Sequence, residues 1–323
     1  MIVSSFGGAS VSWPAVALLG PTAVGKTALA FALADRYPVH LISVDATLVY
    51  RGLAVGAAQP TAAELAAYPH ELIDIRDPAD PYSVADFLTD ARSAMARARA
   101  AGRIPLLVGG TMLYFRALQE GLAELPEARP AFRAALEDRL AAEGLSALIE
   151  ALRAQDPDAA RRIDLKNPRR VLRALEIMDA SGERASVLWD RPVVRPLEED
   201  GFSLQCFGLW PENRAVLHAR IETRFDAMIA AGWLEEAELL RTRGDLSPAL
   251  PALRAVGYPQ WFAHLDGTLS FEAARAEGLA ATRQLARRQL TWLRGWDGLE
   301  RLPLGADFAL PSVSSLAKAF HRP

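Results

Sequence analysis

Gly20-Pro21-Thr22-Ala23-Val24-Gly25-Lys26-Thr27 is the stretch on which the interpretation of this chain depends. An apolar run over residues 15–19 precedes it and an alanine-rich run over 28–34 follows it, an order typical of strand, loop and helix. Two glycines let such a loop wrap tightly, so that its N–H groups and the start of the helix converge on an anion. The pattern therefore predicts a phosphate-binding loop, in which Lys26 neutralises phosphate charge and the Thr27 hydroxyl binds Mg²⁺.

The composition predicts a globular protein with a full hydrophobic core. The chain has 323 residues, of which 51% are hydrophobic and 23% charged, enough for one large domain or two moderate ones. A net charge of −3 excludes a protein-wide basic character, so any nucleic acid would bind local basic patches. The single cysteine, Cys206, is expected to be buried filler. Together with the lack of a basic N-terminal region and of a long apolar run, it favours a cytoplasmic protein without a membrane segment.

Polar residues follow two further apolar runs. Asp45 comes directly after residues 39–44, and Gly109-Gly110-Thr111 completes the run over 104–108. Because the carboxyl ends of parallel strands meet at one edge of an open α/β sheet, we expect Asp45 and Thr111 in the same crevice as the phosphate loop. The alternative for each, on local sequence alone, is a turn residue without a chemical role.

The order of the remaining patterns predicts a P-loop NTPase-like α/β fold, a parallel sheet flanked by helices. Short strands are expected over 71–75 and 202–210. A capping box formed by Ser83 and Asp86 opens a helix that runs to about residue 101. Further helices are expected over 211–232, starting with a proline, and over 234–243 and 271–294, with a Pro- and Gly-containing loop through 258–259.

A change of pattern divides the chain into domains. Residues 122–199 contain no strand-like run, only helical patterns over 131–143, 146–154 and 168–180 that prolines and Gly144 interrupt. We therefore expect an inserted all-helical subdomain over 122–199, a discontinuous core over 14–121 and 200–300, and a C-terminal tail over 301–323.

Basic residues gather in three places of this slightly acidic chain, and such clusters can hold the phosphates and bases of RNA. Each cluster also has an explanation that does not involve RNA. Arginines are common on exposed helix faces, and Trp292 could be a core residue. Arg220 and Arg224 could pair with Glu222 or Asp226 as a structural ion network. The three clusters are Arg161, Arg162, Lys166, Arg169, Arg170 and Arg173; Arg283, Arg287, Arg288 and Arg294 beside Gln289 and Trp292; and Arg220 with Arg224.

Taken together, these motifs resemble those of the tRNA dimethylallyltransferases, also called tRNA isopentenyltransferases. The resemblance runs through most of the chain, which makes it far more specific than a phosphate loop alone. It is carried by residues 20–27, 42–45, 48–52, 69–70, 74–78, 82–83, 107–114, 167–168, Arg170, 173–176, 220–224, 256–258 and 282–294.

The resemblance implies transfer of the dimethylallyl group of dimethylallyl diphosphate to N6 of the adenine 3′ of the anticodon of tRNA, with release of pyrophosphate. The loop from Gly20 to Thr27 would then bind the diphosphate together with Arg224. Asp45 would be the general base, and Thr111 would orient the amine. Since the target base is stacked in the anticodon loop, it would have to be flipped to reach Asp45.

The same resemblance places the contacts to the anticodon stem-loop. We expect Mg²⁺ as cofactor at Thr27, and a monomer because one subunit holds every required part. Departures from the family pattern at Ala46, Thr47, Ala57, Gln59, Arg169 and Pro259 leave Lys26, Thr27, Asp45 and Thr111 unaffected. The expected RNA contacts are Asp45, Ala46, Thr47, Leu48, Thr111, Arg133, Arg169, Arg170, Val171, Leu172, Arg173, Arg254, Gly257, Tyr258, Gln260, Arg283, Arg287, Arg288, Gln289, Trp292 and Arg294.

Two other functions share parts of this pattern. A small-molecule or nucleotide kinase would use the same loop and an acid near the second strand to transfer phosphate without RNA. An NTP-driven switch would bind RNA and hydrolyse a nucleotide without modifying the RNA.

Overall fold

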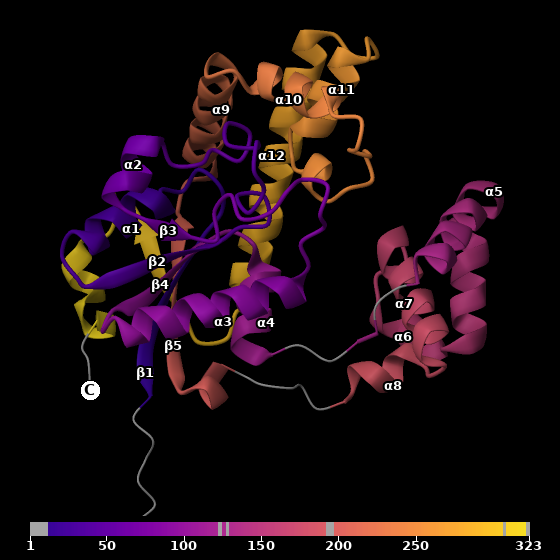
Figure 1. Cartoon of the computed structure of the whole chain (residues 1–323), viewed down its shortest axis with the longest axis horizontal. Coiled ribbons are helices and arrows are strands. Elements are labelled where there is room, and N and C mark those ends of the chain that lie inside the picture. The colour runs from indigo at the N-terminus through magenta and orange to yellow at the C-terminus, as the bar shows by residue number, and fades with distance from the viewer. Residues whose placement is uncertain (1–11, 122–124, 127–128, 192–196, 306–307, 321–323) are drawn as a thin grey trace, which may run out of the picture. The chain divides into compact units, whose positions relative to one another are not determined.

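The chain forms two compact units (Figure 1). The computed structural model describes residues 12–121, 125–126, 129–191, 197–305 and 308–320. The first unit combines Met1–Gln119 with Leu197–Pro323, and the second is Glu120–Pro196. The helical insertion expected from the sequence was 122–199.

A six-stranded, all-parallel sheet forms the centre of the first unit, and it confirms the predicted fold class. The strand order is β3-β2-β4-β1-β5-β6, so the chain starts in the middle of the sheet and adds strands on both sides. The strands are β1 (Trp13–Leu19), β2 (Val39–Val44), β3 (His70–Glu71), β4 (Ile104–Gly109), β5 (Phe202–Pro211) and β6 (Leu299–Leu304).

The apolar runs that predicted strands are those buried deepest. Residues 15–19 of β1 are at most 1% exposed, as a strand covered on both faces requires. Helices α1 and α3 pack against β2 and β4, and the predicted capping box opens α3, with Ser83 and Asp86 exchanging hydrogen bonds of 3.1 and 2.8 Å. The helices between the first four strands and directly after β4 are α1 (Lys26–Ala34), α2 (Ala62–Ala67), α3 (Val84–Ala100) and α4 (Met112–Glu120).

The register of the sheet brings three strand ends to the same level. Leu19 of β1 and Val44 of β2 both lie opposite Gly109 of β4. Only glycine fits at position 109, because an added Cβ would lie 1.9 Å from the Val44 carbonyl oxygen. The loops that follow β1, β2 and β4 therefore leave the sheet side by side.

An aromatic cluster holds the C-terminal helices together. Phe225, Trp233, Tyr258 and Trp261 are at most 2% exposed, and the Trp233 ring centroid lies 5.0 Å from that of Phe225 and 5.9 Å from that of Trp261. The cluster joins helices that follow one another in the chain. These are α9 (Arg214–Ala230), α10 (Trp233–Thr242), α11 (Tyr258–Leu265) and α12 (Phe271–Arg294), with short 3₁₀ turns η1 (Leu197–Asp200), η2 (Ala252–Arg254) and η3 (Val313–Phe320) elsewhere in the unit.

The second unit is helical over its described residues, as predicted for this part of the chain. Its core contains Leu148, Leu152, Val171 and Leu175, all at most 4% exposed. The backbone leaves helical geometry at Gly144, with φ of 79°, where the sequence predicted an interruption. The helices are α5 (Pro130–Gln155), α6 (Pro157–Arg162), α7 (Pro168–Ser181) and α8 (Ala185–Trp189).

A buried carboxylate joins two of these helices. Asp156, which is 0% exposed, accepts hydrogen bonds from the Ala159 and Ser186 amides at 2.9 and 2.8 Å and from the Ser186 hydroxyl at 2.8 Å. It therefore caps α6 and fixes the start of α8 at the same time.

Four local predictions were wrong. The helix expected from residue 211 begins at Arg214, because Pro211 completes β5 and the Asn213 side chain caps the helix. Helix α11 replaces the loop expected around residues 258–259, and β6 occupies part of the expected tail. The strand expected over 71–75 is limited to His70–Glu71.

Cys206 lies on β5 and is 3% exposed, as expected for a filler residue. Burial raises the pKa of its thiol to about 12. None of the helices in the described parts of the chain has the length and apolar character needed to cross a membrane.

Candidate active site

The phosphate loop follows β1 with the geometry of an anion cradle. Gly25, with φ of 103°, precedes the first residue of α1, and Ala23 also has a positive φ of 62°. These left-handed residues turn successive backbone groups of the loop inward, next to the start of a helix. The arrangement places several N–H groups and the positive end of the α1 dipole around one volume.

Lys26 is folded back onto this loop. Its Nζ donates hydrogen bonds to the carbonyl oxygens of Gly20 at 3.0 Å and Pro21 at 2.8 Å. Burial among protein atoms and the positive charge of Arg224 lower the pKa of Lys26 to about 7, while Asp45 acts in the opposite direction. The site therefore holds more positive charge than it balances internally and is ready to accept an anion.

Asp45 leaves the sheet directly after β2 and is held by its own loop. Its Oδ1 accepts hydrogen bonds from the amides of Thr47 at 2.8 Å and Leu48 at 3.3 Å, which fixes the carboxylate in one orientation. The Thr111 Oγ1, at the end of β4, accepts the amide hydrogen of Ala46 at 3.0 Å. The Thr111 hydroxyl thus lies next to the Asp45 backbone, and its own hydrogen is free to be donated elsewhere.

A pocket of about 680 Å³ joins these elements. The phosphate loop, Asp45 and the glycines at the end of β4 line it, together with Arg220 and Arg224 of α9. Thr111 is not among its lining residues, although its neighbour Gly110 is. A carboxylate and an anion cradle therefore face the same cavity, as the strand-end argument predicted.

Arg220 and Arg224 of α9 line the pocket and do not pair with the acids of their own helix in the described part of the chain. Arg220 Nε donates to the Ala23 carbonyl at 3.0 Å. Glu222 and Asp226, the acids expected as possible partners, pair instead with Arg275 and Arg283. Burial lowers the pKa of the Arg224 guanidinium, and the Asp45 charge opposes this shift.

The donor set fits Mg²⁺ that is bound together with a phosphate ligand. Among the described residues, no group of three or more His, Cys, Asp or Glu side chains could enclose a metal ion. The exposed Thr27 hydroxyl, at the start of α1, and the Asp45 carboxylate both face the pocket. Mg²⁺ prefers oxygen ligands and commonly binds through one or two protein groups plus phosphate oxygens and water.

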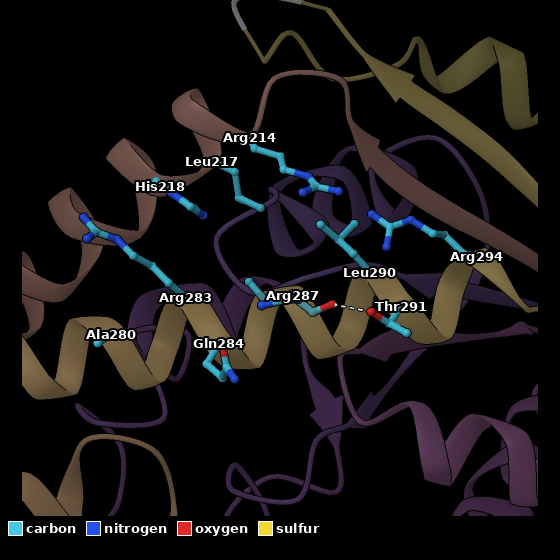
Figure 2. Close-up of a pocket in the computed structure, with 11 residues that line it drawn as sticks. Arg214, Leu217, His218, Ala280, Arg283, Gln284, Arg287, Leu290, Thr291 and Arg294 are labelled. Atoms are coloured by element: carbon cyan, nitrogen blue, oxygen red, sulfur yellow. Dashed lines mark hydrogen bonds between the residues drawn. The ribbon is translucent and has the colours of Figure 1, made fainter.

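A second, basic groove lies between α9 and α12 (Figure 2). It has a volume of about 570 Å³. Arg214, Leu217 and His218 of α9 face the side chains that α12 contributes, among them Arg283, Arg287 and Arg294. Arg283 pairs with Glu222 at 2.9 Å, so its charge is partly balanced within the protein.

Comparison with known proteins identifies the family. The family model for IPP transferase matches residues 48–296. A tRNA dimethylallyltransferase of Thiobacillus denitrificans is 52% identical over 307 residues, which are 95% of this chain and 96% of the relative. The chain belongs to the tRNA dimethylallyltransferase family. It is therefore an enzyme of the transferase class.

Two further relatives agree with this assignment. A tRNA dimethylallyltransferase of Ralstonia nicotianae is 51% identical over 283 residues, covering 87% of this chain and 88% of the relative. The crystal structure of the full-length tRNA isopentenylpyrophosphate transferase of Bacillus halodurans is 36% identical and superposes with a TM-score of 0.65, covering 90% of this chain and 89% of that chain.

In this member of the tRNA dimethylallyltransferase family, the residues expected to contact RNA differ in exposure. Several side chains are directed inward, where they serve the core: Val171 and Leu172 are 0% and 9% exposed in the second unit, and Tyr258 and Gln289 are 0% and 7% exposed in the first. Gly257 is buried as well, with Trp233 filling the space where a side chain would be. The exposed residues are Ala46, Arg133, Arg169, Arg170, Arg254, Arg287, Arg288, Trp292 and Arg294. The partly exposed residues are Asp45, Thr47, Leu48, Thr111, Arg173, Gln260 and Arg283.

Two polar residues of the site have partners that sequence reasoning missed. Glu236 of α10 accepts hydrogen bonds from the Val55 and Gly56 amides, both at 2.8 Å, and so holds a loop that lines the pocket. Gln289 of α12, expected to contact RNA, bonds to the phosphate loop. The sequence offered one signal for these contacts: each polar residue stands on the side of its helix where apolar residues would be expected.

Proposed function

We propose that this enzyme transfers the dimethylallyl group of dimethylallyl diphosphate to N6 of the adenine 3′ of the anticodon in tRNA and releases pyrophosphate. The observation that carries the proposal is the joint position of Asp45 and the phosphate loop in one pocket. The family assignment names the transferase class, and the pocket supplies groups for both halves of the reaction.

Asp45 serves the nucleophile. The exocyclic amine of adenine is a weak nucleophile because its lone pair is delocalised into the ring. As the N6 lone pair forms the bond to the allylic carbon, the carboxylate of Asp45 accepts the N6 proton. The hydrogen bonds from Thr47 and Leu48 hold Oδ1, which leaves the other carboxylate oxygen for this proton.

The phosphate loop serves the leaving group. The carbon–oxygen bond to the diphosphate breaks with its electron pair on oxygen, so negative charge gathers on the departing pyrophosphate. Lys26, Arg224 and the loop N–H groups are placed to stabilise that charge. Mg²⁺ held by Thr27 would add a further positive charge at the diphosphate oxygens.

RNA contacts are proposed for the exposed basic residues expected from the sequence. In the first unit, Arg287 and Arg294 line the groove between α9 and α12, which Arg214 and His218 complete from α9 (Figure 2). Guanidinium groups in such a groove suit backbone phosphates. Arg288 and Trp292 lie beside these groove residues on the same helix, and an exposed tryptophan can stack on an unpaired base.

The pocket is built from one chain, which favours a monomer, and the family's tRNA substrate favours a cytoplasmic location. Size-exclusion chromatography with light scattering tests the first of these proposals, and fractionation of cells tests the second.

Transfer of label from dimethylallyl diphosphate into tRNA tests the function. The wild-type protein with Mg²⁺ is expected to label tRNA that carries adenine 3′ of the anticodon. Asp45→Asn is expected to lower the rate about 10²–10⁴-fold, the usual range for loss of a general base. Asp80→Asn, at an exposed carboxylate outside the pocket, is the matched control and should keep wild-type activity. Absence of transfer by folded wild-type protein, with phosphate transfer from ATP instead, would contradict the proposal.

A further inference from the structure

Gln289 is buried at the contact between α12 and the phosphate loop. Its Oε1 accepts a hydrogen bond from the Thr22 amide at 2.9 Å, and its Nε2 donates to the Gly110 carbonyl at 3.0 Å. The side chain is 7% exposed. One carboxamide therefore ties the phosphate loop after β1 to the glycine pair after β4.

The neighbouring residue of the loop is tied from α9. Arg220 Nε donates to the Ala23 carbonyl at 3.0 Å, and Ala23 has a positive φ of 62°. A left-handed conformation is unfavourable for a residue with a side chain, so the surrounding contacts must hold it. The shape of the loop thus depends on two side chains from the C-terminal helices.

These two helices are also the walls of the basic groove. Arg287, Thr291 and Arg294 of α12 face the groove (Figure 2). Gln289, between them in sequence, lines the other pocket together with Thr282 and Leu285 of the same helix. A shift of α12 on binding a polyanion in the groove would therefore move the Gln289 carboxamide with it.

We propose that Gln289 is a positioning residue that couples RNA binding at α12 to diphosphate binding at the phosphate loop. It acts through its hydrogen bonds with the Thr22 amide and the Gly110 carbonyl. The coupling rests on the proposed function, because it requires both ligands. The two hydrogen bonds by which Gln289 holds the phosphate loop do not depend on that function.

The bond to Thr22 makes the first part of the inference specific. Because the Thr22 N–H is donated to Gln289, the diphosphate is bound by the later N–H groups of the loop, whose orientation this bond sets. Without it, the Thr22 amide would be unpaired and the loop could take up other conformations. By linkage, RNA and pyrophosphate should each increase the affinity for the other by the same factor.

Binding measurements with Gln289→Met test the inference. Methionine keeps the length of the side chain and removes both hydrogen bonds. Without RNA, pyrophosphate affinity is expected to fall about tenfold, and the affinity for a stem-loop RNA without pyrophosphate should change less than about twofold. In wild type, saturating pyrophosphate should raise RNA affinity about tenfold, and in Gln289→Met this factor should approach one. In turnover, the KM for the prenyl donor should rise, and the KM for RNA at saturating donor should rise as well, because bound donor no longer strengthens RNA binding.

Two further variants provide the controls. Gln205→Met changes an exposed glutamine of β5 outside both pockets and should behave as wild type. Gly110→Ala perturbs the same bond from the other side, because the added Cβ would lie 2.5 Å from Gln289 Nε2. Gly110→Ala should reproduce the pyrophosphate and coupling defects, and it decides the matter if Gln289→Met does not fold.

The inference is overturned if folded Gln289→Met, or Gly110→Ala in its place, retains wild-type pyrophosphate affinity and coupling. It is equally overturned if the wild-type protein binds both ligands without coupling. Failure of the proposed function looks different: wild type would transfer no prenyl group, while Gln289→Met would still bind pyrophosphate more weakly than wild type.

Discussion

Lys26 links ligand binding to proton uptake. Its pKa is lowered to about 7 in the ligand-free protein, and a bound diphosphate would raise it, because nearby negative charge favours the ammonium form. At about pH 8 the free lysine is mostly neutral, so binding should take up close to one proton. Above the free pKa, pyrophosphate affinity should therefore fall as the pH rises.

Calorimetry of pyrophosphate binding in buffers of different ionisation enthalpy measures that proton. Lys26→Arg is the matched control, since arginine keeps the positive charge but does not titrate in this range. The variant should lose the uptake that belongs to Lys26 and retain any that belongs to pyrophosphate. Equal proton uptake by both proteins would show that Lys26 is already charged in the free site.

The positions of residues that depend on local sequence could be predicted, and contacts that depend on distant partners could not. Lys26 and Thr27 follow from an eight-residue motif, and Asp45 from its position after an apolar strand. Gln289 bonds to a residue 267 positions away, and Glu236 to one 180 positions away. Nothing in the sequence near either side chain indicates which backbone group it meets.

At the scale of elements, α10 holds the loop that forms one wall of the pocket. Glu236 accepts the Val55 and Gly56 amides at 2.8 Å each and the Tyr258 hydroxyl at 2.7 Å. Gly56 is packed so closely that an added Cβ would lie 2.1 Å from Trp233 Nε1. Glu236→Ala should therefore release the loop and lower the free energy of unfolding by about 2–3 kcal/mol, through loss of several hydrogen bonds to one carboxylate.

Hydrogen exchange measures this release directly. The Val55 and Gly56 amides should lose protection in Glu236→Ala, while the amides of β1 should keep theirs. Glu235→Ala, at the adjacent exposed glutamate, should leave both unchanged. If the two amides remain protected in Glu236→Ala, other contacts must hold the loop.

Elements with strong periodicity and end signals could be predicted closely, and edge elements could not. Helix α12 runs from Phe271 to Arg294 as predicted, with its inward leucines at helical spacing and the Ser270 side chain at its cap. Strand β6 is half exposed and contains Pro303, as edge strands often do, and so gave little signal. Helix α11 was missed because Pro259, tolerated in a first helical turn, also suits a loop.

At the scale of the molecule, the second unit has a core of its own. Its buried residues from Leu136 to Leu188 pack with one another, and the partly buried apolar residues against them also come from this unit. We therefore expect residues 120–196 to fold alone, with a helical circular dichroism spectrum and one cooperative thermal transition. A spectrum without helical character would show that the unit needs the rest of the chain.

Asp156 provides a check within the same fragment. Burial raises its pKa, but the hydrogen bonds from Ser186 and Ala159 outweigh this, and the net pKa lies below 3.8. The stability that the Asp156 carboxylate contributes to the folded unit is therefore present above that pH and lost as the pH falls through the lowered pKa. Asp156→Ala should remove this acid dependence and about 2–4 kcal/mol of stability. Asp158→Ala, at an exposed neighbour, should do neither.

The lone thiol of β5 has a practical consequence for spectroscopy. Thiol-reactive dyes react with the thiolate form of cysteine. Cys206 is buried and its pKa is raised to about 12, so almost no thiolate is present or accessible near neutral pH. One surface cysteine introduced into each unit can therefore be tagged with a fluorophore pair while the native cysteine stays in place. Energy transfer between the two dyes would then follow the separation of the units as RNA is added.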